Sequence, residues 1–523
     1  MQKRRSIRLL STFATAVLVG FVSLAYAPSV GAQQLVFEPG FHQALATSVS
    51  TSTRTTYRTK IPIGRGGSRL RISFRAGDGS LTVHAATVAL AGTQGNLVSA
   101  PVAITFNGAP GFTSNAQGRV TSDPIAFPVS SGNELYVSFD VDGAMAASNI
   151  NNFPDSYAWA NGSVTAQNPS AGTPFMRAAA VDTIDVEGPS TVVMVALGDS
   201  ITEGYVSGGV GGDMSRNDDY RNSWPAIAQA LLGVPIANAA VSGQGVFDAT
   251  GRLQRDVFTL QGLTDCLVLI GTNNLGSATA DQITAGLSDL FANLRPACRI
   301  WVGTLLPKES NCCSDYATVV ARRAAVNDWI RHQAQVDGVI DFEAVLAQPG
   351  NINSFAAGLG EDGIHPSVAG QRLMGQEAAK VLSPLVGPHI EAVSPASGTS
   401  SGGTAVAITG VNFMPGSSLT IGGVPALRLE ISSSGSLKAT TAPHAPGSAD
   451  IVLTNPDGQS ATLPLGFTYA VGPDPAPAPA PFTGGGGCTT SSATPSLLVL
   501  IPLLVFMRFR RSSRRQSPAE TVI

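Results

Sequence analysis

A short β-branched apolar run constrains the fold of this chain more than any other segment. Residues 191–197 read TVVMVAL, which is typical of a buried strand in a parallel sheet. Gly198, Asp199 and Ser200 follow directly. Because open α/β sheets keep their ligand sites beyond the carboxyl ends of their strands, Ser200 stands where a nucleophile is expected. A serine in front of a helix is more commonly an N-cap, and this segment alone is compatible with both roles.

A serine nucleophile needs a base, and the base needs a group that orients it. His365 lies in the segment EDGIHPS, where Asp362 can reach the same imidazole from a turn. Ser367 precedes a helical pattern over 368–374 and can cap it. The alternative is an ordinary surface turn. The other five histidines lack a comparable setting; they are His42, His84, His332, His389 and His444.

Two further strand ends offer donors for an oxyanion. The run 234–242 leads to Gly243, whose backbone N–H no side chain would obstruct. The run 266–270 leads to Gly271, Thr272 and Asn273, and the Asn273 side-chain amide is a natural donor. Glycine turns after strands account for both glycines, but they account less well for the amide.

Four motifs stand in order along the chain: GDSITEG at 198–204, NAAVSGQG at 238–245, IGTNN at 270–274 and DGIHPS at 362–367. Together they resemble the SGNH (GDSL-type) hydrolases over about 170 residues. The resemblance implies a three-layer α/β/α flavodoxin-like domain at 188–386 and the hydrolysis of carboxylic esters by a serine.

The same resemblance implies a role for each motif residue. Ser200 would be the nucleophile, His365 the base and Asp362 its partner. The oxyanion hole would combine the Ser200 N–H, the Gly243 N–H and the Asn273 amide. Asn274 departs from the aspartate that the family often carries at this position, which puts its supporting contacts in doubt but leaves the catalytic set intact.

Both flanks of this domain indicate β structure. Residues 33–187 alternate polar and apolar residues over 55–61, 68–74, 81–90 and 134–140, which predicts a β-sandwich. This segment is similar to the β-sandwich of an acetyl-xylan-esterase-like branch of the SGNH hydrolases, which implies deacetylation of plant polysaccharide. The alternative is a packing module that shields the catalytic domain.

Residues 387–470 look like an IPT/TIG domain, which is an immunoglobulin-like sandwich. Such a unit binds glycan or acts as a spacer. Its only aromatic residues are Phe413, Phe467 and Tyr469, and they suggest no aromatic platform for a sugar. We therefore favour the spacer.

The two ends of the chain indicate export. Residues 1–32 join a basic start, an apolar stretch and a small-residue cleavage site, as in a signal peptide. Residues 471–487 form a Pro/Gly-rich linker. Residues 488–523 hold Cys488, a short apolar run and an Arg-rich tail, and they resemble C-terminal sorting signals of Gram-negative surface proteins. We expect processing or lipidation at Cys488 and a surface tether, the alternative being a membrane anchor.

Without its basic ends the chain is distinctly acidic, which argues against nucleic acid and anionic membranes as partners. Cys266 and Cys298 begin two apolar runs, and neighbouring parallel strands could bring them within bridging distance. Adjacent Cys312 and Cys313 could form a vicinal disulfide or pair elsewhere. The cysteines show no metal-ligand spacing, and we expect neither a metal nor a cofactor.

The sequence therefore predicts an exported serine esterase that acts on an acylated carbohydrate or a small ester. One alternative is a surface adhesion or glycan-binding protein with an inactive hydrolase domain. Another is a short-chain lipase, which the polar stretch at 206–219 disfavours because a lipase needs an apolar approach to its serine.

Overall fold

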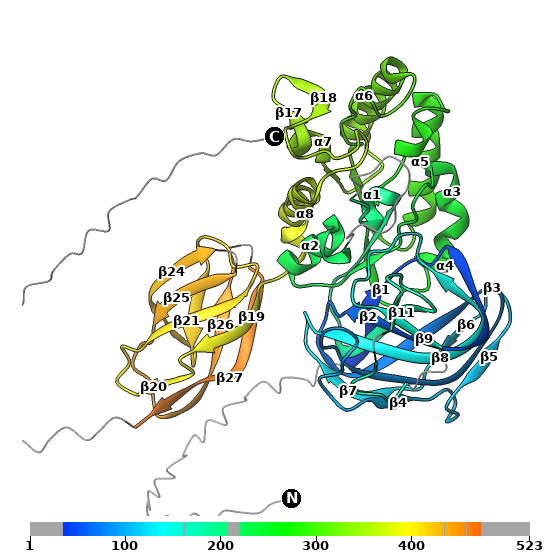
Figure 1. Cartoon of the computed structure of the whole chain (residues 1–523). Coiled ribbons are helices and arrows are strands. Elements are labelled where there is room, and N and C mark those ends of the chain that lie inside the picture. Colours follow the sequence, from blue (N-terminus) through cyan, green and yellow to red (C-terminus); the bar gives the residue numbers. More distant parts are fainter. Residues whose placement is uncertain are drawn as a thin grey trace, which may run out of the picture. The chain divides into compact units, whose positions relative to one another are not determined.

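The computed structural model describes residues 35–160, 164–170, 172–206, 219–433, 435–456 and 458–471. A β-rich region, an α/β region and a second β region follow one another along this part of the chain (Figure 1). The predicted signal peptide, nearly all of the linker, and the sorting signal with Cys488 lie outside the described residues. Within the described ranges, no helix is long and apolar enough to cross a membrane.

The N-terminal region is one 11-stranded sheet with a main path β1-β11-β3-β8-β2-β9-β10. Its strands are β1 (Leu35–His42), β2 (Thr47–Pro62), β3 (Gly67–Leu90), β4 (Val102–Ile104), β5 (Phe112–Ser114), β6 (Arg119–Thr121), β7 (Ile125–Val129), β8 (Glu134–Ala147), β9 (Tyr157–Ala160), β10 (Thr173–Pro174) and β11 (Val181–Pro189). The runs 68–74 and 81–90, which the sequence suggested as separate strands, both belong to β3.

Strand β3 joins the two halves of this sheet. Its first half pairs with β11, β6 and β7, and its second half pairs with β8, β4 and β5. Ile72 and Phe74 from the first half share one core with Val83 and Val88 from the second. The predicted sandwich is thus a single sheet folded over its own core.

The α/β region is built on five parallel strands, β12 (Val193–Gly198), β13 (Ile236–Asn238), β14 (Leu263–Leu269), β15 (Arg299–Gly303) and β16 (Gly338–Ile340). Their order is β13-β12-β14-β15-β16, which is the 2-1-3-4-5 order of flavodoxin-like sheets. Every residue of β12 is buried, which explains why its sequence is a continuous apolar run. The predicted flavodoxin-like fold is confirmed.

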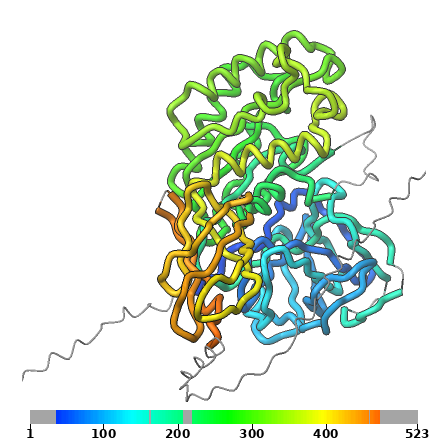
Figure 2. Tube along the Cα trace, turned by 90° about the vertical axis from the view of Figure 1, so that its left-hand side faces the viewer, coloured from blue at the N-terminus to red at the C-terminus, as the bar shows by residue number. Residues whose placement is uncertain are grey.

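The helices of this region are α1 (Ser200–Glu203), α2 (Trp224–Leu232), α3 (Val246–Ala249), α4 (Leu253–Asp256), α5 (Ala280–Leu294), α6 (Tyr316–His332), α7 (Phe342–Leu346) and α8 (Val368–Leu382). Helix α2 packs on α8, whereas α5 packs on α3 and α6. The chain steps from β12 to β13 in one direction and then from β13 past β12 to β14 in the other, so right-handed crossovers place α2 on one face of the sheet and α3 and α5 on the opposite face. The α/β region is the green to yellow-green part of the tube in Figure 2. A two-stranded ribbon, β17 (Ala347–Gln348) and β18 (Asn351–Phe355), precedes α8.

The C-terminal region is a sandwich of two sheets, ordered β19-β21-β25-β24 and β20-β27-β26-β22-β23. The strands are β19 (His389–Ser394), β20 (Ser397–Thr399), β21 (Ala405–Val411), β22 (Ser418–Ile421), β23 (Val424–Pro425), β24 (Leu427–Ser433), β25 (Ser436–Thr440), β26 (Gly447–Thr454) and β27 (Ser460–Ala470). Phe413, Phe467 and Tyr469 are buried in its core, so they form no surface platform.

One disulfide lies within the described residues, and it joins Cys266 in β14 to Cys298 just before β15, with a Cα–Cα distance of 5.8 Å. The bond follows from sheet order, because β14 and β15 are hydrogen-bonded neighbours. Cys312 and Cys313 are both free thiols, so the structure shows neither a vicinal disulfide nor a pairing elsewhere for them.

Candidate active site

In the turn after β12, the helix cap and the candidate nucleophile are two different residues. Asp199, not Ser200, is the N-cap of α1, and its Oδ1 accepts the N–H of Ile201 at 3.0 Å. Ser200 is the first residue of the helix, and its Oγ is free for another partner. The turn also requires Gly198, because a Cβ there would stand 2.7 Å from the carbonyl oxygen of Leu269.

The structure brings Ser200, His365 and Asp362 into one hydrogen-bonded chain. Ser200 Oγ lies 2.8 Å from His365 Nε2, and His365 Nδ1 lies 2.8 Å from Asp362 Oδ2. The second oxygen of Asp362 accepts the backbone N–H groups of His365 and Ile364 at 2.8 and 3.0 Å. Such a chain is the arrangement in which a histidine removes the proton of a serine hydroxyl.

The electrostatics of this loop keep Asp362 ionised. Burial by itself would raise the pKa of Asp362, but the hydrogen bonds from His365 and Ile364 outweigh it and lower the pKa to about 2. A carboxylate at this position accepts the proton on His365 Nδ1, so Nε2 is left to accept the proton of Ser200.

Gly243 and Asn273 lie on loops that follow β13 and β14, the two neighbours of β12 in the sheet. Gly243 has a φ of +82°, which favours glycine, and its backbone is exposed. Asn273 is also exposed, and its Nδ2 donates to the Gln244 carbonyl at 2.8 Å. Because an amide nitrogen carries two protons, one remains for a ligand.

Asn274 has a clear structural contact. Its Oδ1 accepts the N–H of Val246, the first residue of α3, at 2.8 Å. An aspartate would supply an acceptor oxygen at the same place. The amide therefore preserves the contact for which the sequence departure raised a doubt.

Sequence reasoning missed the buried groups that hold this site. Gln371 of α8 donates from Nε2 to the Ile201 carbonyl at 2.9 Å. Arg252 donates from Nη2 to the Gly198 carbonyl at 2.8 Å and also reaches Ala239. Glu203, at the end of α1, accepts hydrogen bonds from two other segments. The motif GDSITEG contains Glu203, but nothing in the sequence predicts that its carboxylate bonds Ser242 and Asn149.

A buried lysine lies behind the histidine loop. Lys308 is only 2% exposed, and its Nζ lies 3.4 Å from the Ile364 carbonyl. Burial lowers the pKa of Lys308 to about 8, although Asp199 opposes the shift. Burial likewise raises the pKa of Asp199 to about 6, against the opposing effects of the Ile201 N–H, His365 and Lys308. Both groups therefore titrate close to neutrality.

Aromatic packing supports the base. The ring of Tyr205 meets the His365 imidazole edge to face, with centroids 4.5 Å apart. Tyr205 directly follows the GDSITEG motif. Most of the polar stretch that follows it, residues 207–218, lies outside the described residues.

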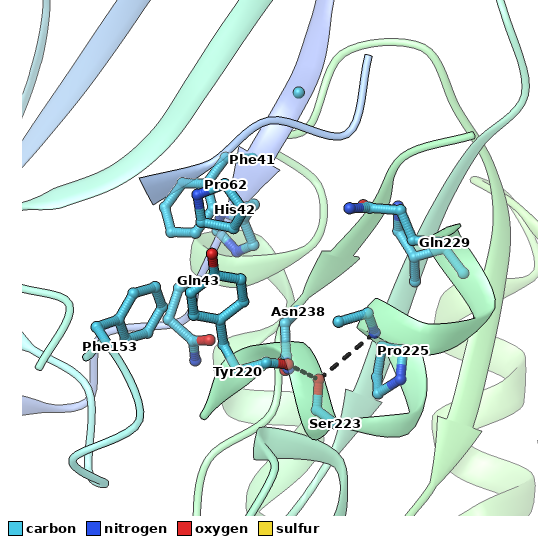
Figure 3. Close-up of a pocket in the computed structure, with 13 residues that line it drawn as sticks. Phe41, His42, Gln43, Pro62, Phe153, Tyr220, Ser223, Pro225, Gln229 and Asn238 are labelled. Atoms are coloured by element: carbon cyan, nitrogen blue, oxygen red, sulfur yellow. Dashed lines mark hydrogen bonds between the residues drawn. The ribbon is translucent and has the colours of Figure 1, made fainter. Parts of the chain in front are cut away.

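Two hollows in the described structure are not lined by Ser200, His365 or Asp362. One is a cavity of about 40 Å³ bordered by His42, Phe153 and Tyr220 (Figure 3). His42 is buried, its Nδ1 bonds Thr183 Oγ1 at 3.0 Å, and burial lowers its pKa to about 4. His42 is therefore a neutral residue of the interior.

Two other histidines have a carboxylate partner: His332 Nδ1 lies 3.3 Å from Asp328 Oδ1, one turn earlier on α6, and His84 has a partner that the sequence did not reveal. His84 Nε2 lies 2.6 Å from Asp142 Oδ2, across the β3–β8 pair. The prediction that no other histidine has a comparable setting is wrong in this respect. The partner is 58 residues away, and only the pairing of the strands brings it close. No serine hydroxyl bonds this imidazole among the hydrogen bonds of the described residues.

Among the described residues, no group of three or more His, Cys, Asp or Glu side chains is arranged to hold a metal ion.

Comparisons with known proteins follow the same division of the chain. The GDSL-like lipase/acylhydrolase family model matches residues 196–373, and the IPT/TIG domain model matches residues 388–469. No curated protein matches the chain.

The chain is similar to several solved structures. A family two carbohydrate esterase from Clostridium thermocellum, in complex with cellohexaose, is 15% identical, with 67% of this chain and 98% of that chain covered and a TM-score of 0.31. A carbohydrate acetylesterase from Sinorhizobium meliloti is 18% identical, with 37% and 99% covered and a TM-score of 0.29. An aryl esterase from M. smegmatis is 18% identical, with 37% and 100% covered and a TM-score of 0.30.

The family match coincides with the strands and loops that assemble the hydrogen-bonded chain from Ser200 to Asp362. The chain therefore carries a GDSL-like lipase/acylhydrolase domain followed by an IPT/TIG domain, and it is a carboxylic ester hydrolase.

Proposed function

We propose that this protein is an exported serine esterase that removes acetyl groups from a polysaccharide or oligosaccharide through an acyl-enzyme. The observation that carries the proposal is the pair of 2.8 Å contacts that link Ser200, His365 and Asp362. A serine in this setting is activated, whereas a serine that merely caps a helix would bond its own backbone.

The reaction runs in two halves. Ser200 Oγ attacks the ester carbonyl carbon while His365 Nε2 takes the hydroxyl proton. The Gly243 N–H, the Asn273 amide and the Ser200 N–H stabilise the oxyanion. His365 then gives its proton to the departing alcohol. In the second half, His365 takes a proton from the water that attacks the acyl carbon, and it then gives this proton to Ser200 Oγ as the bond between that oxygen and the acyl carbon breaks, which releases the carboxylic acid and restores the free serine.

Two features support a hydrophilic substrate. An exposed side chain of the loop after β14 is the polar amide of Asn273, although Phe247 of α3, close to Gly243 in the sequence, is also exposed. The chain is acidic once its basic ends are set aside, which disfavours anionic lipid surfaces. The resemblance of the N-terminal region to that of acetyl-xylan-esterase-like enzymes supports acetyl as the acyl group.

Export is supported by the Cys266–Cys298 disulfide, because such bonds persist mainly in oxidising compartments. The signal-peptide pattern at 1–32 and the tail at 488–523 point the same way, and the tail would tether the enzyme at the cell surface.

The first test addresses the chemistry. Purified wild type should hydrolyse p-nitrophenyl acetate and be labelled by a fluorophosphonate, and Ser200→Ala should do neither. Ser190→Ala is a matched control, because that hydroxyl bonds only Glu38 and lies outside the site. Wild-type activity in Ser200→Ala would refute the mechanism, and an unlabelled wild type would favour an inactive domain in an adhesion protein.

The second test addresses the substrate. Acetate release from acetylated xylan and acetylated pectin fragments should exceed fatty-acid release from p-nitrophenyl octanoate at equal enzyme. A preference for the octanoate ester, increased by detergent micelles, would indicate a short-chain lipase instead.

A further inference from the structure

Glu203 joins the nucleophile helix to two distant segments. Its side chain is 1% exposed. One oxygen, Oε2, accepts the N–H and the Oγ of Ser242, each at 2.7 Å. The other, Oε1, accepts the N–H groups of Asn149 and Ile150 at 3.0 and 3.4 Å. Within the described structure these contacts are hydrogen bonds, and Glu203 forms no ion pair.

Ser242 matters because it shares a peptide group with Gly243. That group consists of the Ser242 carbonyl and the Gly243 N–H, and the peptide is planar and trans, so the two bonds point in opposite directions. Asn149 Nδ2 donates to the Ser242 carbonyl at 3.2 Å. A hydrogen bond that fixes the carbonyl therefore also fixes the direction of the Gly243 N–H.

Asn149 belongs to the N-terminal β region rather than to the hydrolase domain. It lies just after β8, in a loop that is itself held in place. Ser148 donates its N–H to the Ala178 carbonyl at 2.9 Å, and Arg177 donates from Nε to the Ser148 carbonyl at 2.7 Å. Asn152, further along the loop, donates from Nδ2 to the Glu203 carbonyl at 2.8 Å.

We infer that the N-terminal β region completes the oxyanion hole, with Asn149 and Glu203 as positioning residues that hold the Ser242–Gly243 peptide so that the Gly243 N–H faces the substrate. Neither residue touches the substrate; both act through that one peptide group. This inference rests on the proposed function, because it takes the Gly243 N–H as an oxyanion donor. It gives the β region a direct part in catalysis.

The charge of Glu203 suits this task. Burial raises its pKa, and hydrogen bonds from Ser242, Asn149 and Ile150 oppose that rise. A carboxylate accepts at both oxygens, whereas an amide accepts at only one. Glu203→Gln would therefore place an amide NH2 against N–H donors on one side, and either the Ser242 loop or the Asn149 loop would move away.

The test compares kcat, KM and thermal unfolding for Asn149→Ala, Glu203→Gln and Asn293→Ala. Loss of one oxyanion donor costs about 10²–10³ in kcat, so a misdirected donor should lower kcat at least about tenfold. KM for p-nitrophenyl acetate should change little, because ground-state binding does not use the oxyanion geometry. Asn293 is a matched control on the exposed face of α5, where its amide donates to the Asp289 carbonyl of its own helix.

Asn149→Ala keeps the test decisive even if Glu203→Gln fails to fold, because Asn149→Ala removes only the contact to the Ser242 carbonyl. A lower kcat with an unchanged melting temperature would support the inference. Wild-type kcat in Asn149→Ala, or a loss that only follows the folded fraction, would overturn it. Ser200→Ala is measured in parallel, because activity in that variant would overturn the proposed function, whereas the Asn149 and Glu203 variants test only the positioning of the Gly243 N–H.

Discussion

At the scale of single residues, the site depends on burial as much as on the motif. Asp199 takes the capping role, and this frees the Ser200 hydroxyl to meet His365 at 2.8 Å. Asp362 is ionised because four hydrogen-bond and charge contacts from its own loop outweigh its burial. Lys308 and Asp199 carry pKa values displaced toward neutrality by desolvation.

Asn273→Ala should lower kcat by roughly 10²–10³, because it deletes one donor to the oxyanion. KM should stay close to its wild-type value, and the comparison is made with p-nitrophenyl acetate at saturating and limiting concentrations. Asn274→Asp is the matched neighbour, and it should retain activity because a carboxylate oxygen can still accept the Val246 N–H. Equal activity in Asn273→Ala and wild type would remove Asn273 from the oxyanion hole.

Asp362→Asn should lower kcat by roughly 10³–10⁴, because an amide facing Nδ1 favours the tautomer that cannot accept the Ser200 proton.

The contribution of Asp362 to stability should also depend on pH. The folded-state pKa of Asp362, about 2, lies below its ordinary value of 3.8, so its contribution is complete above pH 4 and is lost as the pH falls toward 2. The difference in unfolding free energy between wild type and variant, measured in urea, should shrink over that range. A difference independent of pH would contradict the depressed pKa.

Lys308→Met should stabilise the protein at pH 7, because it removes a buried ammonium whose folded-state pKa is about 8. The unfolded chain keeps that proton up to about pH 10.5, so wild-type stability rises between pH 8 and 10.5 and the advantage of the variant disappears there. Urea unfolding at pH 7 and pH 10.5 should show a gain of roughly 3 kcal/mol at the first pH only. Exposed Lys380→Met is the control, and a similar gain there would point to a general effect of charge.

At the scale of elements, three neighbouring strands of one sheet deliver the site. The turn after β12 carries Ser200, and the loops after β13 and β14 carry Gly243 and Asn273. The strand order reverses its direction at β12, and doubly wound folds bind their ligands beyond the carboxyl ends of the strands at such a point. At the opposite ends of the strands, the Cys266–Cys298 bond ties β14 to β15.

Removing this disulfide should destabilise the sheet without changing the chemistry. Closing a loop of 32 residues restricts the unfolded chain by about 3–4 kcal/mol. Cys266→Ala/Cys298→Ala should therefore lose about that much unfolding free energy but keep kcat at low temperature. Cys312→Ala/Cys313→Ala, which removes only free thiols, is the control. If a reductant lowers the unfolding free energy of the wild type no more than that of Cys266→Ala/Cys298→Ala, the disulfide does not form in solution.

At the scale of the whole molecule, the N-terminal region and the hydrolase domain share buried charges. Arg75 of β3 lies 3.5 Å from Asp256 of α4, and both side chains are at most 3% exposed. The IPT/TIG domain contacts the end of the hydrolase domain through hydrogen bonds from Asn412 to Ser383 and Val386 and from Gln459 to Pro384, and Val411 lies beside Gly233 after α2. The two β regions therefore differ in how far they reach toward the site.

Deleting both β regions and deleting the IPT/TIG domain alone should give opposite results, and the difference between the two variants reports on the N-terminal region. A fragment of residues 188–386 should lose activity and stability, because Asp256 loses its Arg75 partner and Glu203 loses its Asn149 and Ile150 donors. The chain ending at 386 should keep kcat within about twofold of the full protein. Activity with p-nitrophenyl acetate and thermal unfolding decide the matter. A fully active 188–386 fragment would show that the N-terminal region is dispensable for catalysis.

Much of the fold and the site could be predicted because their signals are local. The buried strand β12 is a continuous apolar run, and Asp362 and His365 are three residues apart on one turn, so their contact needs no tertiary information. The two runs within β3 were harder, because alternation at period two does not distinguish one long bent strand from two short ones. The sequence offered Ser200 as the cap of α1, whereas the structure gives that position to Asp199; both residue types favour it, so composition alone does not decide between them.

The sequence by itself determined the buried strands and the candidate residues at their ends, because apolar runs and turn residues are local signals, and the resemblance of four ordered motifs to the SGNH hydrolases implied the fold, the Ser200–His365–Asp362 set and the donors Gly243 and Asn273. Only the tertiary structure placed Asn149 against Ser242, across 93 residues, and buried Lys308 behind the histidine loop. These contacts depend on how the N-terminal sheet and the long loops pack, and packing between distant segments leaves no period or spacing in the chain. The catalytic groups are thus encoded locally, whereas their alignment is a property of the packed molecule.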